Sequence, residues 1–282
     1  MMKKEANDSV NEFRSVLIEK GVYDEKRHSP YYLSRFLKAR QGSIPKASEM
    51  FINCQEWRKT ENVDQIHQFD FPELEKVLDV YPQSFHNVDK QGRLFHIARL
   101  HSFDLSSFLK VSSEDRIIRY HIREMEKTEK YRLPACSVKA GKEIDKIFMV
   151  LDLKDAPNLL QIHSSLSLLQ KLLAIDNSNY PELLSKLIII NAGMIFTGIW
   201  RVVSNVLPRE TVEKISILGS SYKAELLEHV DEDNLPSFFG GKCTCENVNG
   251  GCEMADKGPW NDASIEGYPL SKWEFVSERN TV

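Results

Sequence analysis

The sequence lacks any long hydrophobic run. Its apolar stretches are only a few residues long, far short of the ~20 residues that a membrane-spanning helix needs. Residues 1–30 carry charged side chains throughout, without the apolar core typical of a secretory leader. We therefore expect neither a membrane span nor a leader, and we expect a cytoplasmic protein.

Cysteine is scarce as well. The five cysteines are an odd number, which argues against a complete disulfide framework. Cys243, Cys245 and Cys252 lie together in a glycine-rich tail, a grouping that suggests zinc. A structural zinc site needs four ligands, however, and this first pair is a C-x-C with no fourth cysteine or histidine nearby in the chain. We expect no metal site, but reduced thiols in a tail packed on the domain.

The motifs of common enzyme classes are also missing. The sequence contains no G-x-S-x-G elbow, no P-loop and no H-E-x-x-H. The histidines are scattered, so we interpret them as core or surface residues, and we assign Asp152 a structural role in its strand. We therefore expect no catalytic residues and no enzymatic activity.

Neither sign of charge is in large excess. The net charge of −4 gives no overall attraction to nucleic acid or to anionic lipid, so we expect no nucleic-acid partner and only local contact with membranes. The composition, with 41% hydrophobic and 28% charged residues, is typical of a soluble protein.

Hydrophobic periodicity predicts two kinds of structure along the chain. Apolar residues at helical spacing predict helices in the first sixty residues. From about residue 85, strands alternate with helices, an order typical of a mainly parallel sheet with crossover helices. The sequence thus predicts an α/β protein with an N-terminal helical lobe. The expected strands are 94–100, 144–153, 187–191 and 215–218, and the expected crossover helices are 112–130, 157–175 and 194–206.

Residues 194–207 are apolar on nearly every side. A helix on the surface of a soluble protein normally has one apolar stripe and one polar face, whereas the polar residues here are only Thr197, Arg201, Ser204 and Asn205. Two interpretations remain open. Either the helix is buried in the core on every side, or one face covers an apolar pocket while the other meets an apolar surface outside.

A hydroxyl and an ammonium group follow this helix. Thr211 and Lys214 are three residues apart, so within one helical turn they share a face. Such a pair suits a phosphate or a polyol. The alternative is a solvated turn with an unrelated lysine.

Seven segments, in the same order along the chain, together resemble the CRAL-TRIO lipid-transfer proteins. The resemblance covers about residues 10–265 and is greatest to the branch that exchanges phosphatidylinositol and phosphatidylcholine between membranes. The segments are RFLKAR (35–40), CQEWRK (54–59), YRLPACS (131–137), LDLK (151–154), NYPELLSKLIIINA (179–192), ILGSSY (217–222) and LPSFFGGKCTC…GGC…DKGPWND (235–262).

The resemblance implies an organisation and a function. It implies an N-terminal helical lobe at residues 1–62, a lipid-binding domain that encloses an apolar pocket at 63–245, and a C-terminal extension packed on that domain at 246–282. It also implies a monomeric carrier of one phospholipid, without a cofactor. Such a carrier would contact Golgi, endosomal or other intracellular membranes transiently, with lipid kinases as candidate partners.

The resemblance further assigns a headgroup site. The arginine that ends the family's FL[RK]AR motif falls on Arg40, and the glutamate of its Tyr-Pro-Glu falls on Glu182. Its Thr-x-x-Lys pair falls on Thr211 and Lys214. Arginine and lysine would donate charge-assisted hydrogen bonds to the phosphodiester, while threonine and glutamate would bond to the polyol.

The family's gating helix falls on residues 194–206. We expect its inner face to cover the acyl chains and its outer face, with Ile199 and Val203, to enter the lipid interface. The candidate gate residues are Phe196, Ile199, Trp200 and Val203.

The chain departs from the family where the yeast members bind choline lipids with a Ser-x-Thr pair. Ile147 and Met149 stand there, and neither can hydrogen-bond a phosphate, so we expect little phosphatidylcholine transfer. His96, on a strand that we expect to line the pocket, is able to donate one hydrogen bond. Gln41 and Leu183 replace two basic residues of the yeast members, which predicts a weaker or differently tuned headgroup site.

The sequence therefore predicts a phosphatidylinositol transfer protein. Two alternatives stay open: a carrier or sensor of a sterol or another hydrophobic small molecule, and an interaction module that senses lipid and recruits a partner.

Overall fold

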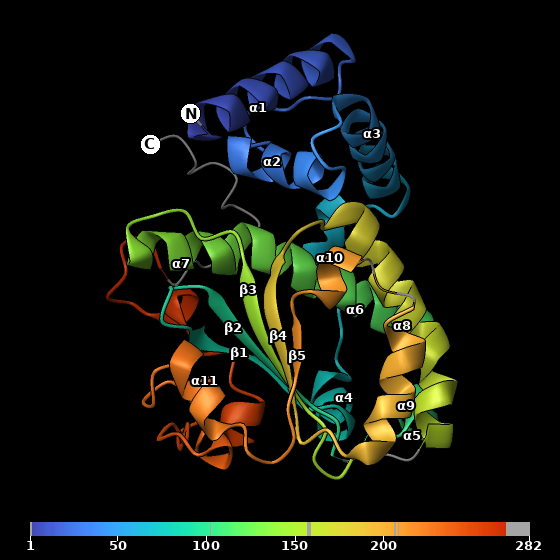
Figure 1. Ribbon diagram of the computed structural model, residues 1–282, viewed down its shortest axis with the longest axis vertical. Helices are drawn as coiled ribbons and strands as arrows, with labels where there is room; N and C mark the ends of the chain where they lie inside the picture. Colours follow the sequence, from blue (N-terminus) through green and yellow to red (C-terminus); the bar gives the residue numbers. More distant parts are fainter. Residues whose placement is uncertain (1, 102, 157–158, 206, 208, 269–282) are drawn as a thin grey trace.

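A five-stranded β-sheet forms the centre of the protein (Figure 1). The structure, a computed structural model, describes residues 2–268 apart from residues 102, 157–158, 206 and 208. The strands lie in the order β1-β2-β3-β4-β5; β1 is antiparallel to β2, and the remaining neighbours are parallel. The predicted α/β class with a mainly parallel sheet is confirmed. The strands are β1 (Gln83–Val88), β2 (Leu94–Arg99), β3 (Ile147–Asp152), β4 (Leu184–Ile190) and β5 (Ile215–Ile217).

Helices precede the sheet and connect its strands. The first four helices come before the sheet in the chain, and most helices after the third lie on one side of the sheet (Figure 1). A π-helical turn (Thr128–Arg132) joins α6 to α7. The helices are α1 (Met2–Glu19), α2 (Pro30–Ala39), α3 (Ile44–Thr60), α4 (Leu74–Val80), α5 (Leu105–Val111), α6 (Glu114–Lys127), α7 (Leu133–Ala140), α8 (Leu159–Asn179), α9 (Met194–Val203), α10 (Arg209–Val212) and α11 (Lys223–His229).

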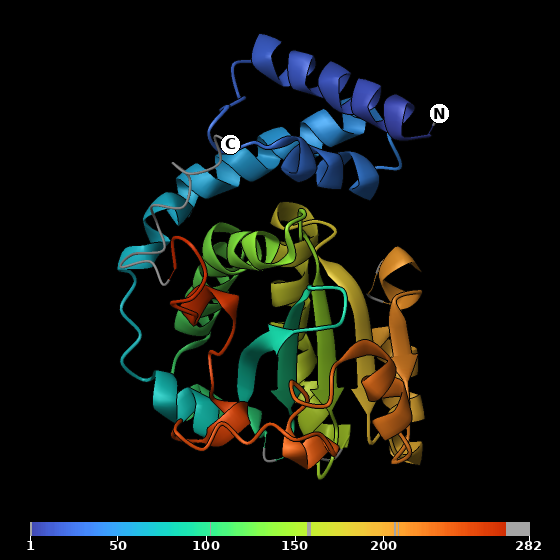
Figure 2. The same ribbon diagram turned by 90° about the vertical axis from the view of Figure 1, so that its left-hand side faces the viewer.

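The N-terminal helices α1 to α3 pack on one another beyond one end of the sheet (Figure 2). Helix α2 begins with a proline at its first position, and Ser29 caps it by accepting a hydrogen bond from the Tyr32 backbone N–H at 3.2 Å. A shared apolar core holds the three helices together. Its buried residues are Phe13, Leu17, Leu33, Phe36, Leu37, Ala47, Met50, Phe51 and Cys54.

A buried ion pair fastens these helices to the rest of the protein. Arg58 of α3 donates to both carboxylate oxygens of Glu126 in α6, at 2.6 and 2.9 Å, and the Tyr180 hydroxyl donates to the same carboxylate at 2.9 Å. Burial alone would raise the pKa of Glu126, but the neighbouring Arg58 and Lys130 lower it to about 2. Glu126 is therefore ionised at neutral pH and ties α3 to α6.

The two faces of the sheet have different neighbours. Along β3, buried and half-buried residues alternate, because successive side chains of a strand point to opposite faces. Phe148 and Val150 are buried in a core with Leu226 of α11 and with Phe239. Ile147, Met149 and Leu151 project from the opposite face, where the cavity described below lies.

The chain after α11 returns to the β1 edge of the sheet. Lys257 forms a parallel bridge with His86 of β1, and its backbone N–H donates to the Phe85 carbonyl at 3.1 Å. Trp260 is fully buried and accepts a hydrogen bond at its carbonyl from the Tyr131 hydroxyl at 2.7 Å. This C-terminal segment therefore contacts both β1 and the π-helical turn that holds Tyr131.

Candidate functional site

A large cavity lies between one face of the sheet and the helices beside it. Its volume is about 1310 Å³, which exceeds the roughly 300–1,000 Å³ typical of sites for drug-sized ligands. Residues of α4, α5, α6, α8 and α9 form the wall opposite the strands (Figure 1). The size and the lining suit a ligand with long apolar chains. Apolar residues of this wall include Val77, Phe108, Ile117, Leu168, Leu172 and Trp200.

The floor of the cavity comes from the middle strands of the sheet. Ile147 and Met149 of β3 both line it. The strand register places Met149 between His96 of β2 and Leu187 of β4, and these two residues also line the cavity. The structure thus brings together the three residues that the sequence assigned to the pocket lining.

His96 is an uncharged polar group on this floor. Burial, together with the positive charges of Arg132 and His121, lowers the pKa of His96 to about 3. Its ring centroid lies 4.6 Å from that of Phe85. A neutral imidazole donates one hydrogen bond and accepts another, but it has no charge to pair with a phosphate.

Helix α9 contributes aromatic and apolar side chains to the cavity. Phe196, Trp200 and Val203 all line it, and the rings of Phe196 and Trp200 are stacked with their centroids 6.3 Å apart. Residues four and three apart lie on one face of a helix, so these three side chains form the inner face. Val203 therefore lies on the inner face and not on the outer face expected from the sequence. The side chain of Ile199 lies outside the described residues.

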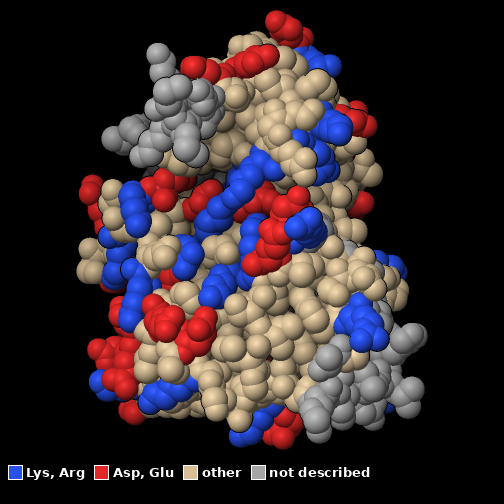
Figure 3. Space-filling model, in the orientation of Figure 1, with Lys and Arg blue, Asp and Glu red and all other residues tan. Residues whose placement is uncertain are grey.

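Polar side chains gather at the end of the cavity nearest the N-terminal helices. Arg40 stands at the C-cap of α2, Glu182 in the turn before β4, Thr211 in α10, and Lys214 just before β5. All four line the same cavity. On the surface, basic side chains form a band below the N-terminal helices, with acidic side chains among them (Figure 3). The residues that the sequence assigned to the headgroup therefore converge, although they come from distant parts of the chain.

Glu182 is the centre of an ion-pair network at this end. Its Oε2 lies 3.1 Å from Lys214 Nζ and 3.4 Å from Lys38 Nζ. Its backbone carbonyl accepts a hydrogen bond from the Lys146 ammonium. The φ angle of Glu182 is +60°, a left-handed conformation that costs a non-glycine residue about 1–3 kcal/mol and that tends to occur in ligand-binding sites.

The charge of Glu182 follows from these neighbours. Burial alone would raise its pKa, but the hydrogen bond from Lys214 and the charges of Lys214, Lys38 and Lys146 lower the pKa below its ordinary value. Glu182 is therefore a carboxylate that accepts hydrogen bonds. The ionised groups lining this end leave one net positive charge, which suits a singly charged phosphodiester. The cations are Lys38, Arg40 and Lys214, and the carboxylates are Glu182 and Glu210.

Sequence reasoning missed two of these lysines. Lys38 lies within the RFLKAR segment, two residues before Arg40, and the structure places it on the cavity beside Glu182. Lys146 directly precedes β3 and reaches across to the turn before β4. The position of Lys38 inside a motif was a usable signal, whereas the contact of Lys146 depends on strand pairing.

Comparisons with known proteins place the chain in a family. The family model described as the CRAL/TRIO domain matches residues 78–241. "Phosphatidylinositol/phosphatidylcholine transfer protein SFH7" of Arabidopsis thaliana is 40% identical over 276 residues, which cover 96% of this chain and 50% of that protein. "Sec14 cytosolic factor" of Schizosaccharomyces pombe is 38% identical over 231 residues, covering 82% of this chain and 79% of that protein.

The lengths and folds of the similar proteins add two facts. The chain spans about half the length of the Arabidopsis relatives SFH7 and SFH12. The solved structure titled "Crystal structure of Sfh5" superposes with a TM-score of 0.53 at 19% identity, covering 70% of this chain and 68% of that one. That likeness shows a shared fold. The match to the family model and the identity to these relatives show that the chain belongs to the CRAL/TRIO domain family.

Proposed function

We propose that this protein is a carrier that takes phosphatidylinositol out of one membrane and releases it into another. The observation that carries the proposal is the convergence of Arg40, Glu182, Thr211 and Lys214 at one end of a large apolar cavity. The names of the Arabidopsis relatives describe phosphatidylinositol and phosphatidylcholine transfer, which supports the same class of ligand.

The polar end provides complementary groups for an inositol phospholipid. Arg40 and Lys214 would donate charge-assisted hydrogen bonds to the phosphodiester. Thr211 and the Glu182 carboxylate would bond to the inositol hydroxyls. The carboxylate is useful there because a polyol offers several donors, whereas a choline headgroup offers none.

The cavity must also replace the apolar contacts that the acyl chains lose when the lipid leaves the bilayer. Burial of a methylene group contributes ~0.8 kcal/mol, so two acyl chains with ~30 methylenes require on the order of 25 kcal/mol of apolar contact. The apolar floor and helical wall supply that contact. Helix α9, whose inner face lines the cavity, would cover the acyl chains, because an open apolar surface of this size would be adhesive in water. The helix would then move aside for loading and release.

The floor of the cavity favours a weakly polar second ligand over a choline phospholipid. Ile147 and Met149 offer no hydrogen bonds, and the neighbouring His96 is uncharged. A choline phosphate placed against them would be an unpaired buried charge, which is costly. A sterol or another weakly polar lipid is therefore the second candidate ligand for this cavity.

We further propose that the protein acts from the cytoplasm, touches membranes transiently, and supplies lipid to lipid kinases without catalysing a reaction itself. Among the described residues, no helix is both long enough and apolar enough to cross a bilayer. Transient contact would suffice for a carrier that loads and unloads at membrane surfaces.

Transfer of labelled phosphatidylinositol between vesicles tests the proposal. Arg40→Ala and Lys214→Ala should each slow transfer about tenfold to a hundredfold, because a buried charge-assisted hydrogen bond contributes ~1.5–3 kcal/mol. Lys142→Ala, at an exposed lysine in the loop before β3, is the control and should leave transfer unchanged. Normal transfer by both folded site variants would overturn the headgroup assignment.

A further inference from the structure

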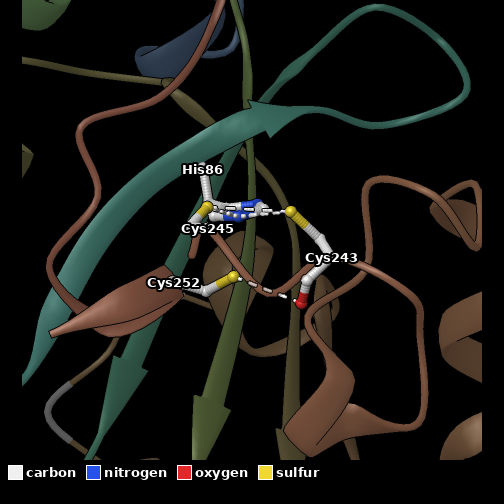
Figure 4. A group of neighbouring side chains, drawn as sticks. All are labelled: His86, Cys243, Cys245 and Cys252. Carbon is white, nitrogen blue, oxygen red and sulfur yellow. Dashed lines mark hydrogen bonds between the residues drawn. The ribbon is translucent and has the colours of Figure 1, made fainter. Parts of the chain in front are cut away.

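Four potential metal ligands meet beside β1, the edge strand of the sheet (Figure 4). His86 comes from β1, and Cys243, Cys245 and Cys252 come from the segment after α11. Their ligand atoms all lie within 4.8 Å of one another. His86, Cys243 and Cys252 are buried and Cys245 is half-buried. The His86 ring centroid lies 6.3 Å from that of Phe95, which belongs to the core on the sheet face away from the lipid cavity.

Three of the distances among the ligand atoms match those of a tetrahedral centre. Zn²⁺ binds cysteine sulfur at ~2.3 Å and histidine nitrogen at ~2.0–2.1 Å, which separates two sulfurs by about 3.8 Å and a sulfur from a nitrogen by about 3.6 Å. The Cys243 and Cys245 sulfurs are 3.7 Å apart, and His86 Nε2 lies 3.5 Å from the first and 3.4 Å from the second. A disulfide would require a sulfur–sulfur distance of ~2.05 Å. His86, Cys243 and Cys245 are thus at tetrahedral spacings, and the Cys252 sulfur, which donates to the Cys243 carbonyl at 3.4 Å, lies within 4.8 Å of each of them.

The backbone holds these ligands in place. Cys243 donates its N–H to the Leu235 carbonyl at 3.0 Å and accepts at its own carbonyl from the Ser237 N–H at 2.8 Å. The carbonyl of Cys252 accepts from the Ser84 hydroxyl of β1 at 2.7 Å. Cys245 has a φ angle of +49°, a strained conformation for a non-glycine residue that turns the chain back within the cluster.

A cation outside the cluster balances its charge. Three thiolates and a neutral imidazole around Zn²⁺ leave one net negative charge. Lys257 Nζ lies 3.4 Å from the Cys243 sulfur, where its ammonium would offset that charge. Groups of this kind just outside the ligands commonly orient them and tune the metal.

We propose that His86, Cys243, Cys245 and Cys252 bind one Zn²⁺ ion that fastens the C-terminal segment to β1. A set of three thiolates and one imidazole in tetrahedral arrangement selects zinc among the common divalent ions. Four protein ligands leave no open position for substrate, so the role of the ion is structural. Binding releases the three thiol protons to solvent as the thiolates form.

Among residues close together in the sequence, only three of these four ligands are present, so no metal site was expected. The C-x-C pair and the third cysteine lack a fourth partner nearby, but strand β1 supplies His86 from 157 residues earlier. The ion would also hold part of the cavity wall in place, because Met254 and Asp256 line that cavity and lie between Cys252 and the bridging Lys257.

The zinc content of the full chain, purified without a histidine tag, tests the proposal. Elemental analysis and native mass spectrometry should find one zinc ion per chain. Cys245→Ala and His86→Ala should lower that content to a small fraction, whereas Cys136→Ala, at a buried cysteine outside the cluster, should keep it. Cobalt added to chelator-treated protein should give the intense visible absorption of tetrahedral thiolate coordination, and Cys245→Ala should lose it.

Several results would overturn the proposal. A folded chain without zinc and with five free thiols would do so, and so would a mass two hydrogens lighter that reveals a disulfide within the cluster. If the cluster variants fail to fold, the metal content of the unsubstituted chain decides alone. A strong chelator should lower its melting temperature and leave that of metal-depleted protein unchanged; an identical melting curve with and without chelator would contradict a structural ion.

Discussion

The floor of the cavity predicts that donors placed on β3 create a site for choline lipids. In the double variant Ile147→Ser/Met149→Thr, two hydroxyl groups replace two apolar side chains that line the cavity. A hydrogen bond to a charged phosphate contributes ~1.5–3 kcal/mol, so even one productive bond should raise phosphatidylcholine affinity about tenfold. Both positions are only half-buried, so the domain should remain folded.

The assay compares labelled phosphatidylcholine and phosphatidylinositol side by side. The unsubstituted protein should transfer phosphatidylinositol much faster than phosphatidylcholine. The double variant should gain about tenfold for phosphatidylcholine and change little for phosphatidylinositol. Leu151→Thr places a hydroxyl on the same face of β3, about 7 Å from residue 149 and about 13 Å from residue 147 along the strand, and it should give no gain. Equal native rates for both lipids, or a folded double variant without a gain, would refute this reasoning.

Three further predictions concern the gate, the headgroup site and the junction with the N-terminal helices. Because Trp200 lines the cavity, phosphatidylinositol with a quencher on its acyl chain should dim the tryptophan fluorescence, and Trp200→Phe should remove most of that quenching; undiminished quenching would place the chains elsewhere. Lys38→Gln should slow phosphatidylinositol transfer only about two- to fivefold, since its side chain is 64% exposed and exposed pairs contribute ~0.2–1 kcal/mol; a loss as large as that of Lys214→Ala would contradict this ranking. Glu126→Gln should lower the free energy of unfolding by about 3 kcal/mol in denaturant titrations, because Arg58 loses its buried carboxylate and keeps only the partly exposed Asp64, at 2.7 Å; a cost below 1 kcal/mol would show that this ion pair does not hold α3 to α6. Since the pKa of Glu126 falls from 4.5 to about 2 on folding, its stabilisation is complete above pH 4.5 and is lost as the pH falls toward 2, so the variant should show a weaker acid dependence in that window.

The sequence predicted the longer helices and the parallel strands because their apolar residues recur with a clear period, whereas the short helices α4, α5, α7, α10 and α11 were not predicted. β3 carries apolar side chains on both faces, and the structure shows why: one face packs in the core and the other lines the cavity. β1 (Gln83–Val88) was not predicted. Its sequence QSFHNV is short and mostly polar, and it pairs at an edge where the C-terminal segment supplies its other neighbour.

The candidate site was less predictable than the fold. The headgroup residues were named through family resemblance, and their meeting in one cavity depends on pairing between distant segments. The assignment of Val203 to the outer face ignored the helical period, since positions 196, 200 and 203 share one face. The partnership of His86 with three cysteines joins residues 157 positions apart, which a search for local spacing does not detect.

The identity of the lipid that the protein carries tests the central claim most directly. Native mass spectrometry of the protein purified from its own cells should find one phosphatidylinositol molecule per chain, and Arg40→Ala/Lys214→Ala should lose it while keeping the fold. A sterol as the bound molecule, or a cavity occupied equally in the double variant, would contradict the account.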